Sequence, residues 1–313
     1  MPDLRTVFFG SSDFAVSALQ ALKAGGLAPL LVVTKPDAPR GRGRKIYDNE
    51  IKLAAQALGL ACAQPEDPHS AEFIDQLHAL KPDLGVVISY GVILKPQLLA
   101  LPKLGHINAH ASLLPYFRGA APIQHALWQG HSETGITIMR IIEALDAGDI
   151  LLQEKTPIDA KENAGQLRAR LAALSGKALV NAIQMIASGK AKYQQQDDSK
   201  VSYAKKIEKI DGVINWRQPA IKIDLLVRAM TPKPGAQTRL GAKRLIVMEG
   251  FVEQDIYGLG IPGALQSSGE EGIRVCTGKD LFRITRIKPE NGRNMTAGEF
   301  VRGHHIAPDA RFS

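Results

Sequence analysis

The chain has 313 residues, of which 45% are hydrophobic and 22% are charged, which suffices for a large core and for more than one domain. Lys and Arg number 39 against 31 Asp and Glu, and the formal net charge of +8 fits a polyanionic partner as well as an ordinary basic surface. Cys62 and Cys276 stand outside any CxxC or metal-ligand spacing, so we expect neither a disulfide nor a structural zinc site. No stretch approaches a membrane-spanning length and the N-terminus has no signal pattern, so we expect a cytoplasmic protein with no membrane partner.

Short apolar runs alternate with amphipathic stretches in the first part of the chain. Runs typical of strands cover 6–10, 30–33, 84–89, 105–110, 136–142 and 150–152. Helical periodicity covers 12–23, 49–58, 71–80, 121–129 and 166–186. This alternation predicts an α/β domain over residues 1–189, built on a wound, mostly parallel sheet of Rossmann-like type. No GxGxxG follows the first strand, so a dinucleotide fingerprint is absent.

The pattern changes after Gly189. Residues 190–206 are polar and are predicted to form a linker, and residues 207–313 a second, smaller domain. Strand-like runs at 213–216, 244–252, 273–276 and 281–287, with a helix at 221–230, predict a small β-barrel or sandwich. Residues 191–313 hold 20 Lys and Arg against 14 Asp and Glu, whereas residues 1–190 hold 19 against 17. The second domain is therefore a candidate nucleic-acid docking surface, with a merely solvated basic surface as the alternative.

A basic loop, residues 35–45, follows the second predicted strand. Its basic residues include Arg40, Arg42 and Arg44, which alternate with two glycines, and Lys45, which follows Arg44. Glycines let the backbone bend close to a ligand, and guanidinium groups bind phosphates in a bidentate manner. Ligands of wound α/β folds gather at the carboxyl ends of strands, which favours a binding role over a purposeless surface loop.

Asn108 and His110 stand two positions apart in a strand, so their side chains point to the same face. His106 shares that face and is expected to pack lower in the sheet. Asp146 follows in the segment Leu-Asp-Ala-Gly-Asp, and an amide, an imidazole and a carboxylate together can polarise a carbonyl and move a proton. The turn-rich connection 111–122 suits a binding loop. We therefore expect an acyl-transfer enzyme.

The string Asn108-x-His110-x-Ser112-Leu113-Leu114-Pro115-x-x-Arg118-Gly119, with Asp146 in its Leu-Asp-x-Gly-Asp context, resembles the signature of the folate-dependent formyltransferases. Further segments resemble the branch of that family that acts on methionyl initiator tRNA. They are the Arg-Gly-Arg loop, Gly-Ala-Ala-Pro-Ile-Gln at 119–124, Glu-Thr-Gly-Ile-Thr-Ile-Met at 133–139 and Tyr-Ala-Lys-Lys-Ile at 203–207. The resemblance spans nearly the whole chain.

The resemblance implies transfer of the formyl group of 10-formyltetrahydrofolate to the α-amino group of methionyl initiator tRNA, without a metal. It makes Asn108, His110 and Asp146 the catalytic residues, and it places Ser112, Leu113, Leu114 and Pro115 along the folate pocket. It also implies that the loop of Arg40, Arg42, Arg44 and Lys45 enters the acceptor stem, and that an oligonucleotide-binding-like (OB-like) C-terminal barrel docks the tRNA. Lys205 and Lys206 are candidate phosphate contacts or ordinary exposed lysines. We expect a monomer.

Three other functions stay open at this point. The acceptor could be a different amine, such as a glycinamide ribotide or an amino-sugar nucleotide, or it could be water, which would make the chain a formyltetrahydrofolate hydrolase. The chain could also be a noncatalytic RNA-binding protein, although such a module has no need of the three polar residues. Whether Asp146 accepts a proton or orients His110 is likewise open.

Overall fold

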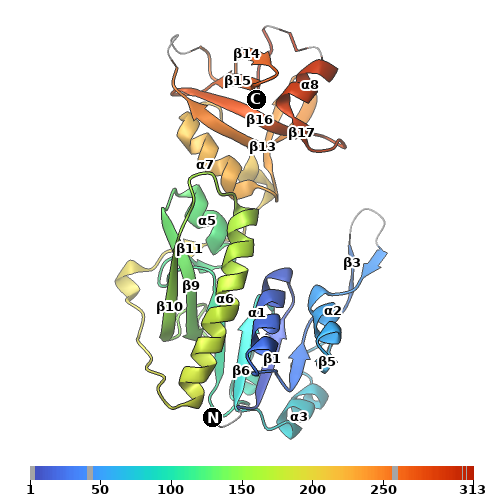
Figure 1. The fold of residues 1–313 in the computed structure, drawn as a ribbon, viewed down its shortest axis with the longest axis vertical. Helices are drawn as coiled ribbons and strands as arrows, with labels where there is room; N and C mark the ends of the chain where they lie inside the picture. Colours follow the sequence, from blue (N-terminus) through green and yellow to red (C-terminus); the bar gives the residue numbers. More distant parts are fainter. Residues whose placement is uncertain (1–3, 41–44, 256–259, 305, 308) are drawn as a thin grey trace. The chain divides into compact units, whose positions relative to one another are not determined.

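A computed structural model describes residues 4–40, 45–255, 260–304, 306–307 and 309–313 (Figure 1). The chain forms two compact units, which are not simply successive in sequence. The first unit comprises residues up to Pro122, Glu133–Pro157 and Arg168–Ala204. The second unit comprises Ile123–Ser132, Ile158–Leu167 and Lys205–Ser313. The boundaries at 189 and 207 stay a prediction.

The first unit is built on a seven-stranded sheet in the order β10-β9-β7-β6-β1-β2-β5. Neighbouring strands from β7 to β5 are parallel, whereas β9 runs antiparallel to both β7 and β10. This confirms the wound, mostly parallel sheet. The strands are β1 (Thr6–Gly10), β2 (Leu31–Val33), β5 (Cys62–Ala63), β6 (Leu84–Ile88), β7 (His106–His110), β9 (Glu133–Arg140) and β10 (Ile150–Pro157).

Helices cover both faces of this sheet, because its central strands are apolar on both sides. Figure 1 shows α1 and α6 on one face, where Gly176 of α6 lies against Ala21 of α1. On the other face, Val7 and Phe9 of β1 belong to a buried cluster with residues of α3 and α4. The helices of this unit are α1 (Asp13–Ala24), α2 (Glu50–Ala57), α3 (Ala71–Ala79), α4 (Pro96–Leu99) and the greater part of α6 (Ala164–Ala187).

The basic loop differs from the sequence-based expectation. Its flanks pair with each other as a two-stranded antiparallel hairpin, β3 (Ala38–Arg40) and β4 (Lys45–Tyr47). Asp37 anchors the base of the hairpin, since its carboxylate accepts hydrogen bonds from Lys52 Nζ, Gln64 Nε2 and the Asn49 N–H. These contacts, led by that from Lys52, lower the pKa of Asp37 to about 2.

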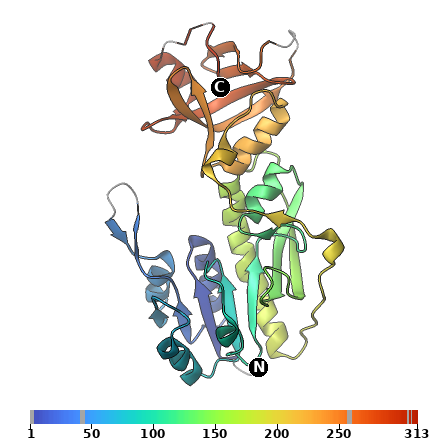
Figure 2. The ribbon, with the colours of Figure 1, turned by 180° about the vertical axis from the view of Figure 1, so that it is seen from behind.

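The second unit contains an antiparallel sheet in the order β12-β13-β16-β15-β14, with β17 paired to β16. Its strands are β12 (Ala236–Leu240), β13 (Lys243–Glu253), β14 (Leu265–Gly269), β15 (Gly272–Cys276), β16 (Leu281–Pro289) and β17 (Met295–Thr296). The α-helices described for this unit, in whole or in large part, are α5 (Pro122–Trp128), α7 (Ala220–Met230) and α8 (Ala297–Gly303). Figure 2 shows the sheet from behind.

The C-terminal residues link the two edges of this second sheet. Leu240 of β12 bridges Phe312, and Ala264, just before β14, bridges Arg311. A segment that pairs with both edge strands, as Arg311 and Phe312 do, is a feature of a sheet that closes into a barrel. The closed OB-like barrel itself stays a prediction.

One predicted strand, 213–216, is wrong. Only Val213 makes a bridge, to Gln237, and turns follow it. The Asn215 side chain accepts a hydrogen bond from the Arg217 N–H, a local bond that competes with strand pairing. Trp216 is buried and donates its indole N–H to Thr238 Oγ1, 2.9 Å away.

Over the described ranges, no helix has the length and apolar character that crossing a membrane requires.

Candidate active site

Strand β7 delivers Asn108 and His110 to the carboxyl-terminal edge of the parallel sheet. Asn108 aligns with Val87 of β6 and with Met139 of β9, and it is half-buried. Within the described part of the chain, its carboxamide has no hydrogen-bond partner. Ligands of wound α/β folds bind at this edge, so the amide N–H groups are available to a ligand's oxygen.

His110 is 6% exposed and lies between two oxygen acceptors. Its Nε2 is 2.9 Å from the carbonyl oxygen of Phe117, and its Nδ1 is 3.6 Å from Asp146 Oδ2. A carbonyl accepts and never donates, so Nε2 carries the hydrogen that it donates to Phe117. The separation of Nδ1 from Asp146 exceeds a hydrogen bond, which leaves Nδ1 as the ring nitrogen that can exchange a proton with a ligand.

Asp146 reaches His110 from the loop after β9, in a left-handed conformation with φ of 49°. Its Oδ2 accepts a hydrogen bond from the Gly119 N–H at 2.8 Å, which fixes one carboxylate oxygen beside the imidazole. The structure thus brings together His110 and Asp146, which are 36 residues apart in the sequence. The described residues include no cluster of three or more His, Cys, Asp or Glu side chains that could hold a metal ion.

Gly119 is held at this place by a second short strand. It lies in β8 (Arg118–Gly119), which pairs in parallel with β11 (Tyr203–Ala204). Its φ is 122°, and a Cβ there would come within 2.6 Å of the Ala204 carbonyl oxygen. Only glycine fits this close approach, so its N–H can point at Asp146.

The segment predicted to line a folate pocket is held mainly through its backbone. Ser112 is fully buried and donates its hydroxyl to the Tyr116 carbonyl at 2.6 Å, so the hydroxyl shapes the turn. Thr137 Oγ1 donates to the Ser112 carbonyl at 2.7 Å and accepts from the Leu114 N–H at 3.1 Å. Leu113 and Pro115 are half-buried, whereas Leu114 is buried.

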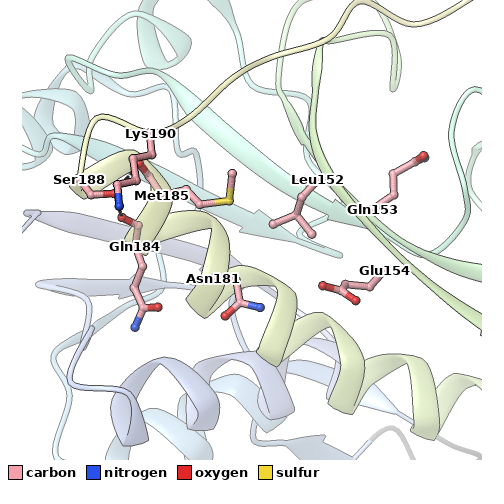
Figure 3. Close-up of a pocket in the computed structure, with 8 residues that line it drawn as sticks. All are labelled: Leu152, Gln153, Glu154, Asn181, Gln184, Met185, Ser188 and Lys190. Carbon is pink, nitrogen blue, oxygen red and sulfur yellow. Dashed lines mark hydrogen bonds between the residues drawn. The ribbon is translucent and has the colours of Figure 1, made fainter.

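Gln153 of β10 supports the same segment. Its amide donates to the Leu114 carbonyl at 2.8 Å and to Thr137 Oγ1 at 2.9 Å. A hollow of about 510 Å³ lies between β10 and α6, and Figure 3 labels the residues that line it, Gln153 among them. Leu152 and Glu154 extend from one face of the strand there, and Gln153 extends from the opposite face. The residues that line this hollow include none of the predicted site residues, and Gln153 connects β10 to the site on the other face.

The predicted tRNA contacts are described only in part. Arg40 and Lys45 are the paired inner residues of the β3–β4 hairpin, and their side chains lie outside the described residues, as do Arg42 and Arg44 altogether. Lys205 and Lys206 have exposed side chains. The Lys205 carbonyl accepts a hydrogen bond from His125 Nε2 at 3.0 Å, which fixes the backbone and leaves the ammonium group in solvent.

Four residues that support the backbone around the site were not predicted from the sequence. Gln153 and Gln196 were not singled out, and Arg118 and Thr137 entered only as letters of motifs. Gln196 is buried within the stretch that was predicted to be a linker. A polar side chain between apolar strand residues, as at Thr137 between Ile136 and Ile138, is a signal that could have found one of them.

A carboxamide without a partner among the described residues, beside an imidazole–carboxylate pair at the carboxyl edge of a wound α/β sheet, is the arrangement expected of a group-transfer enzyme that acts on a carbonyl. The family model described as formyl transferase matches residues 4–183, and the model of the formyl transferase C-terminal domain matches residues 206–305. The chain belongs to the formyl transferase family.

Relatives match along almost the full chain. A methionyl-tRNA formyltransferase of Moorella thermoacetica is 40% identical over 97% of this chain and 98% of its own length. One of Halorhodospira halophila is 41% identical over 97% of both chains. The crystal structure of an N-formyltransferase from Helicobacter canadensis, in complex with folinic acid and dTDP-3-aminofucose, superimposes with a TM-score of 0.67 at 17% identity, covering 90% of this chain and 99% of that one. That likeness supports the fold.

Proposed function

We propose that this chain transfers the formyl group of 10-formyltetrahydrofolate to the α-amino group of methionyl initiator tRNA, a step that serves translation initiation. The observation that carries the proposal is the contact between His110 and Asp146, next to an Asn108 amide that has no hydrogen-bond partner among the described residues. The relatives named methionyl-tRNA formyltransferase support the choice of substrate, since they are about 40% identical over nearly the whole chain.

The chemistry of formyl transfer makes two demands on the site. Attack of the neutral amine on the formyl carbon forms the new C–N bond, places negative charge on the formyl oxygen and positive charge on the nitrogen. The Asn108 amide donates a hydrogen bond to that oxygen, and loss of such a donor typically raises the barrier by about 2.7–4 kcal/mol. Collapse of the intermediate then breaks the bond between the formyl carbon and the folate nitrogen.

His110 and Asp146 carry out the proton transfers that accompany formyl transfer. The amine loses one proton and the departing folate nitrogen gains one, so the net reaction consumes none. Nδ1 of His110 takes part in this exchange, because Nε2 is occupied by the Phe117 carbonyl. Asp146 stabilises the protonated imidazole from 3.6 Å and accepts the amine proton directly or through water.

The binding roles follow from the same proposal. Ser112, Leu113, Leu114 and Pro115 line the folate pocket through a backbone that Thr137 and Gln153 hold in place. The loop of Arg40, Arg42, Arg44 and Lys45 binds the acceptor stem. Lys205 and Lys206 contact phosphates of the tRNA, together with the basic second unit. The enzyme works as a cytoplasmic monomer.

A transfer assay tests the proposal. Purified protein is mixed with 10-formyltetrahydrofolate and methionyl initiator tRNA, and formylmethionyl-tRNA and free formate are both measured, with a matched reaction that lacks tRNA. The proposal expects formylmethionyl-tRNA and no formate without tRNA. Formate released in the absence of tRNA would assign the chain to hydrolysis, and tRNA binding without turnover would leave a noncatalytic RNA-binding protein.

A further inference from the structure

Gln196 is a buried glutamine in the segment that leads from α6 to β11, and it is 6% exposed. Its Nε2 donates to the carbonyl oxygens of Asp146 and Gly148, each at 2.8 Å. Its Oε1 accepts from Arg118 Nε at 3.1 Å and from Arg118 Nη2 at 2.9 Å. Both amide hydrogens and the amide oxygen are therefore used, and one side chain joins two loops that are far apart in sequence.

The loop of Asp146 and Gly148, to which Gln196 donates both hydrogen bonds, is strained and closely packed. Asp146 has a positive φ without being glycine, a conformation that persists only where the surroundings enforce it. A Cβ on Gly148 would come within 1.9 Å of the Arg140 carbonyl oxygen, so the backbone of the loop lies against the end of β9. The two hydrogen bonds from Gln196 hold the carbonyl groups of Asp146 and Gly148, and so they fix the backbone that carries the Asp146 side chain.

Gln196 is also connected, through Arg118, to the hydrogen bond that the Asp146 carboxylate accepts from Gly119. Arg118, which donates to Gln196, directly precedes Gly119, whose N–H donates to Asp146 Oδ2. The Arg118 guanidinium is buried, and its ion-pair partner, Asp198, is exposed. The main chain of Asp146 and the donor to its carboxylate are thus both tied to Gln196.

We propose that Gln196 is a positioning residue that aims the carboxylate of Asp146 at Nδ1 of His110. This inference rests on the proposed function for its catalytic consequence, whereas the geometric link between Gln196, Asp146 and Gly119 stands without any substrate. A small misplacement of a catalytic group lowers the rate by as much as about 100-fold. Gln196 is therefore expected to govern kcat and to leave the binding of folate and tRNA unchanged.

Three variants separate its contacts. Gln196→Met keeps the length of the side chain and removes both donors and the acceptor. Gln196→Glu keeps an acceptor for Arg118 and turns a carboxylate oxygen toward the two loop carbonyls. Asp198→Ala is the matched control, since the exposed carboxylate of Asp198 contacts Arg118 and not the loop of Asp146. We expect kcat to fall about 10- to 100-fold in both Gln196 variants, with KM for either substrate within twofold, and to stay within twofold in Asp198→Ala.

Amide hydrogen exchange gives a readout that needs no substrate. The Gly119 N–H is protected by Asp146 Oδ2, so it should exchange at least tenfold faster in both Gln196 variants, while amides of β1 and β6 keep their rates. Unchanged exchange at Gly119, or an equal acceleration throughout the first unit, would overturn the inference, as would an unchanged kcat in an active enzyme. If the wild type transfers no formyl group, the proposed function fails and the exchange of Gly119 still decides the positioning role.

Discussion

His106 and His110 lie on the same face of strand β7, four residues apart, and have opposite environments. His106 is 2% exposed, packs against Gly85 and lies 5.8 Å from the ring of Phe9. Neither of its ring nitrogens has a hydrogen-bond partner within the described residues. Burial lowers the pKa of His106 to about 4, an effect that the nearby backbone of Leu99 offsets only in part.

His110 is almost as buried and yet has oxygen atoms beside both nitrogens. The difference comes from the position of each residue along the strand. At the carboxyl end, the loops that carry Phe117, Gly119 and Asp146 converge on the imidazole. At the amino end, His106 meets only apolar packing and backbone. The two side chains occupy equivalent positions on the strand, and only the carboxyl end brings polar groups of neighbouring loops to the imidazole. This difference supports the chemical role that we propose for His110.

Replacing each histidine in turn should give the largest contrast. His110→Ala removes the proton-exchanging nitrogen, so kcat for formyl transfer should fall by about 10²- to 10⁴-fold. His106→Leu is the control, because it replaces a buried histidine of the same strand face without touching Asp146. Its kcat should stay within a fewfold of the wild type. Equal losses in the two variants would contradict the assignment of chemistry to one end of β7.

The stability of the first unit should fall in acid because of His106. Above pH 6.5 this histidine is neutral in both the folded and the unfolded chain, so its contribution to the free energy of unfolding is fully present. Between pH 6.5 and about 4 the unfolded chain takes up a proton that the folded chain refuses, which costs about 3 kcal/mol in total. Urea unfolding across this range should show a smaller loss for His106→Leu, and parallel curves would refute the effect.

Gly119→Ala tests whether the approach of β8 to β11 sets the site. The added Cβ meets the Ala204 carbonyl, and the left-handed φ is unfavourable as well, so we expect a destabilisation of about 1–3 kcal/mol and a lower kcat. Gly189→Ala is a matched control with φ of 67° and no atom within 4 Å of the added Cβ. Thermal unfolding and kcat should therefore separate the two variants. If both variants lose stability and neither loses kcat, the close approach of Gly119 to Ala204 does not position the site.

The smallest effect is expected at the predicted phosphate contacts. Lys205→Ala should weaken tRNA binding and reduce the slope of log affinity against log salt by about 1, with kcat unchanged. Lys103→Ala removes an exposed lysine of the first unit and should leave that slope as it is. Fluorescence titration of the tRNA at several salt concentrations measures both. Identical slopes would leave Lys205 as an ordinary exposed lysine.

The order of helices and strands and the face shared by Asn108 and His110 could be predicted from the sequence, because both depend on local periodicity. The pairing of β3 with β4 and the turns after Val213 could not, since short pairings and side-chain caps leave little periodic signal. The supporting residues were also out of reach. Gln196 lies 50 positions from Asp146, and nothing in a polar stretch shows that one of its amides is buried.

The most direct test of the account is Asp146→Asn, which keeps the shape of the side chain and removes its charge. Single-turnover formyl transfer to methionyl initiator tRNA should slow by at least about 100-fold, since the imidazole of His110 loses its only neighbouring carboxylate within the described residues. A rate within twofold of the wild type would mean that the pair formed by His110 and Asp146 does not carry the reaction.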